Sequence, residues 1–92
     1  LSQAKLSRAK FEHVDFSSGS FEGASLVQSK FNHTKLVEAN FHAADLTQAT
    51  TWGCTCTSAN LEEAKLTRAS LRNSSWKKAS FKNADLAKAD LK

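Results

Sequence analysis

The protein is a chain of 92 residues with a net charge of +4, 40% hydrophobic residues, two cysteines and no methionine or proline. This length suits one domain, but an ordinary globular core would also use Ile and Met, and the sequence contains neither. No run of residues is long and apolar enough to cross a bilayer, no secretory signal opens the chain, and two cysteines cannot form a disulfide framework. We therefore expect a cytoplasmic protein, or one that is exported as part of a longer chain.

Every leucine and phenylalanine occupies the same position of a five-residue unit. The six phenylalanines and all leucines, from Leu1 to Leu91, stand at residue numbers that leave a remainder of 1 on division by five. We call this position the centre of the unit. A small residue, most often Ala, stands two positions before each centre, and the other three positions are mainly polar.

A period of five suits neither a helix nor a flat strand. Five residues turn a helix by about 140° beyond a full turn, and on a strand they alternate between faces, so either element would expose half of the leucines. The pattern is explained if the small residue and the centre both point inward across a short extended segment, after which the chain turns a corner. Successive coils would then stack through backbone hydrogen bonds at about 4.8 Å.

Several units carry a known motif. These are Ala4-Lys5-Leu6-Ser7-Arg8, Ala44-Asp45-Leu46-Thr47-Gln48, Ala59-Asn60-Leu61-Glu62-Glu63 and Ala84-Asp85-Leu86-Ala87-Lys88. They resemble the A-(D/N)-L-x-x repeat of the pentapeptide-repeat family, and the resemblance runs through the whole chain in one phase. It implies an all-β fold, a right-handed quadrilateral parallel β-helix with four units in each coil of twenty residues, and hence about 4.6 coils.

The core is predicted to consist of the large centres. In chain order these are Leu6, Phe11, Phe16, Phe21, Leu26, Phe31, Leu36, Phe41, Leu46, Leu61, Leu66, Leu71, Trp76, Phe81 and Leu86. We expect residues 1–92 to form a single β-helical domain that is a segment of a longer protein, because neither end shows a cap. Further coils, a capping helix or end-to-end self-association would cover these ends.

The stretch 49–58 departs from the pattern. Thr51 occupies a centre and Trp52 an outward position. Either Trp52 is exposed, or a bulge near Gly53 swings it inward in place of Thr51. We expect exposure, because the phase continues without an insertion or deletion. Cys54 and Cys56 fall on inward positions and are predicted to be buried, with the small Cys56 compensating for the large Trp76 one coil above, whose indole N–H needs an acceptor.

No catalytic, metal or cofactor site is predicted. His13 and His33 share an outward column with Gly53, but two imidazoles without a carboxylate make a poor metal site, and His42 lies on another face. Carboxylates are single and spread over four sides, and no glycine-rich phosphate loop occurs. We therefore predict that the protein is not an enzyme.

A candidate partner surface combines the basic end with the exposed tryptophan. Residues 61–92 hold eight Lys or Arg against four Asp or Glu, arranged as a collar around the last coils, with Lys92 in the column of Arg72. Trp52 has Arg72 one coil above it, which predicts either a cation–π pair or a protein-contact hot spot. The candidate residues are Trp52, Arg68, Arg72, Lys77, Lys78 and Lys82; a merely solvated surface is the alternative.

These features favour a rigid scaffold that presents its walls to a protein partner. Nucleic acid is disfavoured, because the aromatic residues that would stack on bases are buried apart from Trp52. The resemblance also implies two other functions known in bacterial members of the family. One is a DNA mimic that binds DNA gyrase or topoisomerase and protects against quinolones, which requires a strongly acidic face. The other is a docking or targeting module of a secreted effector.

Overall fold

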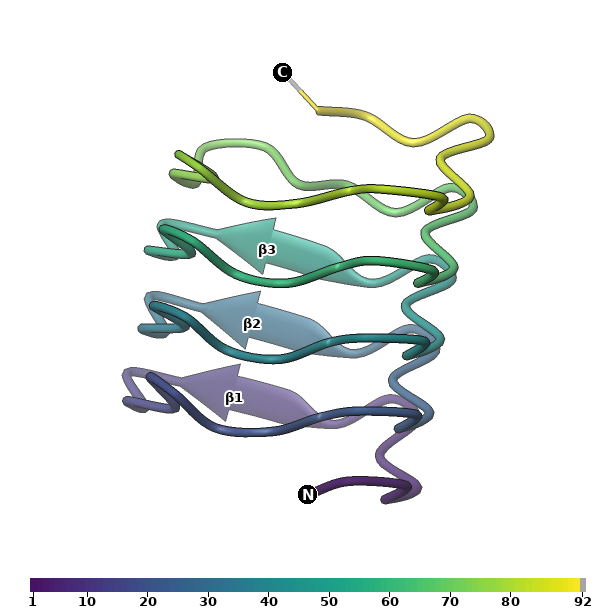
Figure 1. Cartoon of the computed structure of the whole chain (residues 1–92). Coiled ribbons are helices and arrows are strands. Elements are labelled where there is room, and N and C mark those ends of the chain that lie inside the picture. Colours follow the sequence, from purple (N-terminus) through teal and green to yellow (C-terminus); the bar gives the residue numbers. More distant parts are fainter. Residues whose placement is uncertain (92) are drawn as a thin grey trace.

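The chain winds into stacked coils with its two ends at opposite ends of the stack (Figure 1). The computed structural model describes residues 1–91. Its strands are β1 (Lys10–Glu12), β2 (Lys30–Asn32) and β3 (Thr50–Trp52), which form a parallel sheet in the order β1-β2-β3. The other bridges, such as Lys5 with Ser25, also join residues twenty apart in parallel. Residues 1–91 contain no helix, and so none that could cross a membrane. The predicted fold class, an all-β parallel β-helix, is confirmed.

The chain turns a corner every five residues, and one residue of each corner has left-handed backbone angles. The second residue after each centre has a positive φ, as in Arg8 (66°) and Ser18 (61°). At most corners the carbonyl of the centre accepts a hydrogen bond from the amide three residues on, for example Leu6 from Ala9 at 3.1 Å. A positive φ at the third residue of such a turn is the mark of type II. Each unit therefore contributes one inward segment and one corner.

Asp or Asn before the centre stabilises the corner that follows. The Asp15 Oδ1 atom accepts the amide of Ser17 at 2.9 Å, and Asn60 Oδ1 accepts the amide of Glu62 at the same distance. A side chain of this length can replace a backbone carbonyl in a turn, which is why Asp and Asn favour such positions. This contact explains the recurrence of Asp and Asn in the repeat.

One corner of each coil is built differently. Strands β1 and β2 run through the centres Phe11 and Phe31. Among the described residues, the amides of Val14 and Thr34 do not donate the usual turn hydrogen bond to the carbonyls of these centres. Instead, the small residue reaches back one coil: Thr34 Oγ1 donates to the carbonyl of Phe11 at 3.4 Å, and Cys54 Sγ donates to that of Phe31 at 3.1 Å. Thr34 and Cys54 thus place a hydroxyl and a thiol where most units have alanine.

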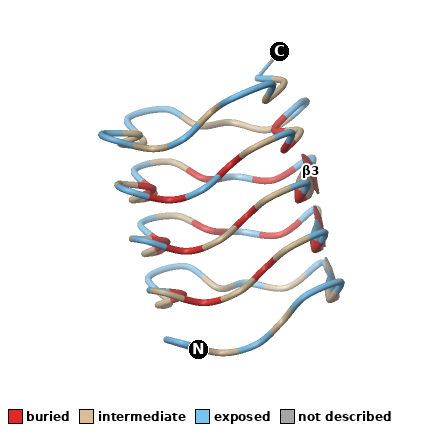
Figure 2. Cartoon of the chain, turned by 90° about the vertical axis from the view of Figure 1, so that its right-hand side faces the viewer, coloured by how far each residue is buried: buried red, intermediate tan, exposed pale blue. Residues whose placement is uncertain are grey.

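The core is a stack of centres along the axis. The nine predicted core residues of the middle coils are buried, and those near the two ends are partly buried, as the distribution in Figure 2 shows. The buried set is Phe21, Leu26, Phe31, Leu36, Phe41, Leu46, Leu61, Leu66 and Leu71; the partly buried set is Leu6, Phe11, Phe16, Trp76, Phe81 and Leu86. Stacked rings add to this packing, with Phe21 and Phe41 centroids 4.9 Å apart and 5° from parallel.

The two unusual centres are also inside. Thr51 is 6% exposed, and its hydroxyl accepts a hydrogen bond from Ser74 Oγ at 3.1 Å. Cys56 is fully buried, and this burial, together with the nearby Cys54, raises the pKa of its thiol far above the ordinary value. The Trp76 indole N–H donates to the carbonyl of Leu71 at 3.3 Å, so the predicted need for an acceptor is met. Both thiols are free and buried.

Candidate functional site

Trp52 projects from the end of β3 and is 54% exposed. Because Thr51 before it points inward, the alternation along the strand turns the indole outward. The prediction that Trp52 is exposed is therefore confirmed. Leu1 and Leu91 are the other large exposed hydrophobic side chains among residues 1–91, and both lie at the ends of the stack, so Trp52 stands out on the wall of the β-helix.

The backbone around Trp52 departs from the regular ladder. In the column of His13, His33 and Gly53, the two histidine amides each donate to the carbonyl of the residue nineteen positions on, as His33 does to Trp52 at 2.8 Å. The amide of Gly53 instead donates to Asn73, one residue further, and the described chain forms no fourth strand there. Gly53 has a φ of +66°, and a Cβ atom at this position would lie 2.5 Å from Nδ1 of His33. Glycine avoids both the cost of this φ angle, which His33 in the same column bears at 51°, and a displacement of the neighbouring ring.

Arg72 does not pack on the Trp52 ring. Its Nε atom lies 3.6 Å from Asp90 Oδ2, and within residues 1–91 no cation–π contact forms. The predicted cation–π pair is wrong, because the carboxylate on the adjacent coil offers the guanidinium a full opposite charge. Both side chains are about half exposed, and an ion pair of this kind contributes about 0–1 kcal/mol.

The candidate partner residues fall on different sides of the β-helix. Trp52 and Arg72 stand on the wall that carries β1–β3, and Arg68 stands on the corner that leads into it. Lys77 and Lys78 follow the centre at Trp76, two corners beyond that of Arg68. Lys82 lies one coil above Glu62 on another side, and Lys92 lies outside the described residues. The structure therefore places Trp52, Arg68 and Arg72 on one wall, without contacts among them, and Lys77, Lys78 and Lys82 on other sides.

The net positive charge of the described residues is concentrated on one side. We define the Trp52 wall as the three outward columns that begin at Arg8, Lys10 and Glu12 and recur every twenty residues. Its charged members are the basic Arg8, Lys10, Lys30, Arg68, Arg72 and Lys88 and the acidic Glu12 and Asp90, six against two. The rest of residues 1–91 hold six basic and seven acidic groups. The basic groups of the last coils thus lie on several sides, as the predicted collar requires, and the excess of positive charge over residues 1–91 lies on the Trp52 wall.

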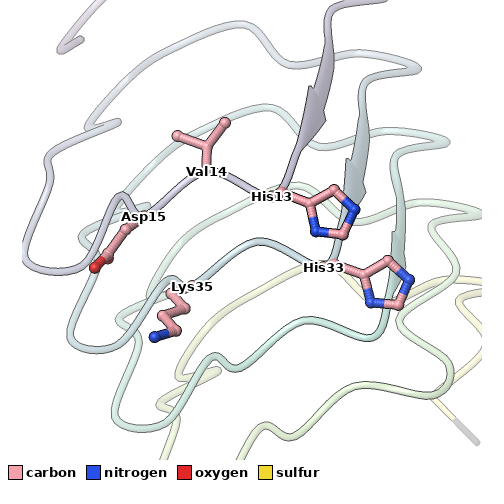
Figure 3. Close-up of a pocket in the computed structure, with 5 residues that line it drawn as sticks. All are labelled: His13, Val14, Asp15, His33 and Lys35. Carbon is pink, nitrogen blue, oxygen red and sulfur yellow. The ribbon is translucent and has the colours of Figure 1, made fainter.

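Two histidines stack at the far corner of this wall. The rings of His13 and His33 lie 5.2 Å apart and 7° from parallel. They border a hollow of about 260 Å³ that Val14, Asp15 and Lys35 also line (Figure 3). The imidazoles and the Asp15 carboxylate point to opposite sides of Val14 and do not converge (Figure 3). No three His, Cys, Asp or Glu side chains in the described part of the chain are placed to hold a metal ion.

The charges beside this hollow are satisfied locally. Hydrogen bonds from the amide and hydroxyl of Ser17, and then the charge of Lys35, hold the pKa of Asp15 below its ordinary value. On another side of the β-helix, His42 lies 3.4 Å from a Glu22 oxygen and 3.8 Å from a Glu63 oxygen. These groups make pairwise surface contacts, and none of them shares a pocket with a buried nucleophile.

Five-residue units, corners with one positive φ angle each, and stacked parallel coils define a β-helical solenoid. The chain belongs to the pentapeptide-repeat family: the family model "pentapeptide repeat region" matches residues 24–92, and the model "pentapeptide repeats (8 copies)" matches residues 1–32. No curated protein matches the chain.

Several solved structures share the fold. HetL of the cyanobacterium Nostoc sp. strain PCC 7120, a protein involved in the regulation of heterocyst differentiation, is 29% identical with a TM-score of 0.78, over 97% of this chain and 47% of HetL. Rfr23 of Cyanothece 51142 is 29% identical with a TM-score of 0.58, over 88% of this chain and 63% of Rfr23. QnrB1, a plasmid-mediated fluoroquinolone resistance protein, is 19% identical with a TM-score of 0.63, over 97% of this chain and 54% of QnrB1. The chain thus spans about half the length of HetL and QnrB1.

Proposed function

We propose that this β-helix is a non-catalytic scaffold that presents the Trp52 wall to a protein partner. The observation that carries the proposal is the exposed indole of Trp52 at the one place where the repeat is broken. Leaving a large aromatic side chain in water costs free energy, and neither its ring nor Gly53 is needed to maintain the five-residue pattern. Aromatic and arginine side chains are enriched at the energetic centres of protein interfaces.

The distribution of reactive groups supports a non-catalytic role. Both thiols are buried, and burial raises the pKa of Cys56, so neither is available as a nucleophile. Acid–base catalysis needs groups that converge in a pocket, whereas Asp15 and His13 diverge on either side of Val14 (Figure 3). Free cysteines also fit a reducing compartment, and we propose a cytoplasmic location.

Charge favours the scaffold over a DNA mimic. A protein that imitates DNA must offer a strongly acidic face, but six of the eight charged groups of the Trp52 wall are basic. The likeness to QnrB1 is one of fold. A docking module of a larger effector would bind its protein partner through the same residues of the Trp52 wall, so this function is compatible with the proposal. Stacking of a second copy on the exposed ends at Leu1 and Leu91 is a further proposal.

The experiment is a comparative affinity capture from a lysate of the source organism. The bait is the wild type, Trp52→Ala, or Lys77→Glu/Lys78→Glu, which changes the charge of a different corner. We expect a protein that the wild type and the lysine variant retain and Trp52→Ala loses. Retention of the same proteins by all three baits would exclude the Trp52 wall, and inhibition of gyrase supercoiling by the purified protein would favour the mimic.

A further inference from the structure

The Trp52 wall carries like charges that the fold leaves unbalanced. Lys10 and Lys30 are directly paired in register between β1 and β2, and both are exposed. Neither forms an ion pair within residues 1–91. Like charges directly opposite each other on adjacent strands destabilise a sheet. An opposite charge placed between them would relieve this repulsion, so the wall is better suited to an acidic ligand than to bare solvent.

In the column that begins at Arg8, next to that of Lys10 and Lys30, hydrogen bonds join side chains of successive coils along the axis. Arg8 Nε donates to Gln28 Oε1 at 3.1 Å, and Gln28 Nε2 donates to Gln48 Oε1 at 3.3 Å. These contacts hold side chains of three successive coils in one row, which continues to Arg68 and Lys88. The row is basic at both ends and polar in its middle, and it runs parallel to the column of Lys10 and Lys30. The row is about 19 Å long, given four coil steps of about 4.8 Å, and Trp52 stands at the other edge of the wall, beyond the column of Lys10 and Lys30.

From this arrangement we infer that the Trp52 wall binds an extended acidic segment of the protein partner. The inference rests on the proposed function and names the chemistry of the partner. Carboxylates of the segment contact Lys10, Lys30 and Arg68, and an apolar side chain packs on the Trp52 ring. Lys10, Lys30, Trp52 and Arg68 lie on successive coils, so the segment runs along the column direction and crosses these coils.

The charge density favours a peptide over a nucleic acid. Duplex DNA carries one charge per about 1.7 Å, so a 19 Å length would bring about eleven phosphates to the wall. The wall offers six basic groups, interrupted by Glu12 and Asp90. Single strands are bound by several aromatic side chains on which successive bases stack, whereas Trp52 is the one large hydrophobic ring exposed on the wall in the described chain. A segment with a few carboxylates matches both the charge and the single aromatic anchor.

The test measures binding of a fluorescein-labelled peptide of twelve residues, rich in Glu with one central Phe, by fluorescence anisotropy at low salt. We expect saturable binding that Lys10→Gln/Lys30→Gln weakens at least about fivefold, and that a version of the peptide with Gln for Glu loses. The matched control, Lys77→Gln/Lys78→Gln, removes the same charge from a different corner and should change affinity less than about twofold. Trp52→Ala should weaken the Phe peptide more than a peptide with Ala in its place.

Three results would overturn the inference: no saturable binding, equal weakening by the two lysine pairs, or tighter binding of a DNA or RNA oligonucleotide of equal charge. None of these results decides the proposed function, because the capture experiment tests Trp52 with the natural partner and makes no assumption about the charge of that partner. Conversely, loss of a captured partner on Trp52→Ala with no peptide binding would retain the wall and reject its acidic ligand.

Discussion

Replacing Ser29 by alanine should stabilise the protein. Ser29 is fully buried at the small position of its unit, where its column otherwise contains Ala9, Ala49, Ala69 and Ala89. Its hydroxyl has no hydrogen-bond partner within residues 1–91, although its amide makes the usual corner bond to Leu26 at 3.0 Å. The side chain is therefore a desolvated polar group in a site shaped for a methyl group.

The expected gain follows from this lost solvation. A buried hydroxyl without a partner costs about 1–3 kcal/mol, and the hydrophobic and packing environment of the remaining methyl group is unchanged. Ser29→Ala should raise the free energy of unfolding by about 1 kcal/mol, which for a domain of this size raises Tm by about 4–8 °C. Urea unfolding followed by far-UV circular dichroism measures the change, with an unchanged m-value as the sign of an unchanged fold.

A reciprocal variant makes this prediction sharp. Ala49 is buried in the same column one coil above, so Ala49→Ser would introduce the same kind of orphaned hydroxyl. It should lower stability by about as much as Ser29→Ala raises it. The reasoning is refuted if Ser29→Ala destabilises the protein, or if Ala49→Ser is neutral, because either result would mean that these hydroxyls are satisfied in solution.

Three further predictions concern the corners. Ala43→Gly should stabilise the protein by about 0.5–1 kcal/mol, because Ala43 holds a φ of 58° that costs an L-residue energy and glycine none; a lower urea midpoint would contradict this. Gly53→Ala should destabilise it by about 1–3 kcal/mol through the positive φ and the clash with His33, and a neutral effect in thermal unfolding would show that the ring simply moves away. Asp15 has a lowered pKa in the folded state, so its contribution to stability is full above the ordinary pKa and is lost as the pH falls through the folded value. The difference in urea midpoint between wild type and Asp15→Ala should therefore be largest at pH 7 and shrink as the pH falls below the ordinary pKa of aspartate, and a pH-independent difference would exclude this role.

The five-residue period predicts most of the fold because each unit repeats the same physical constraint. A large apolar residue at every centre except Thr51 and Cys56 leaves one way to bury them all, and an unbroken phase through Gly53 places Trp52 outside. The spacing shows only one corner per unit, and the number of four units in a coil is what the family resemblance implies. The bridges between residues twenty apart, such as Thr50 and Ser70, show this number directly.

Other features depend on contacts between coils that a linear tally does not reveal. The open corner shows in the sequence only as Thr34 and Cys54 in place of alanine, and their hydrogen bonds to carbonyls one coil below supply the reason. Arg72 was paired with Trp52 by column, but Asp90, on the coil above, provides the stronger electrostatic partner. Each segment of the chain visits all sides of the β-helix, so its net charge does not show on which side the basic groups lie. The excess of positive charge on the Trp52 wall becomes visible only along columns of residues twenty apart.

The inward orientation of the centres is tested most directly by one pair of variants, Leu66→Ala and its neighbour Lys65→Ala, compared by urea unfolding. Leu66 is fully buried and Lys65 is exposed. Leu66→Ala should lower the free energy of unfolding by about 2–5 kcal/mol, and Lys65→Ala should change it by less than about 0.5 kcal/mol. Equal losses from the two substitutions, or a helical circular dichroism spectrum of the wild type, would contradict a β-helix built on these centres.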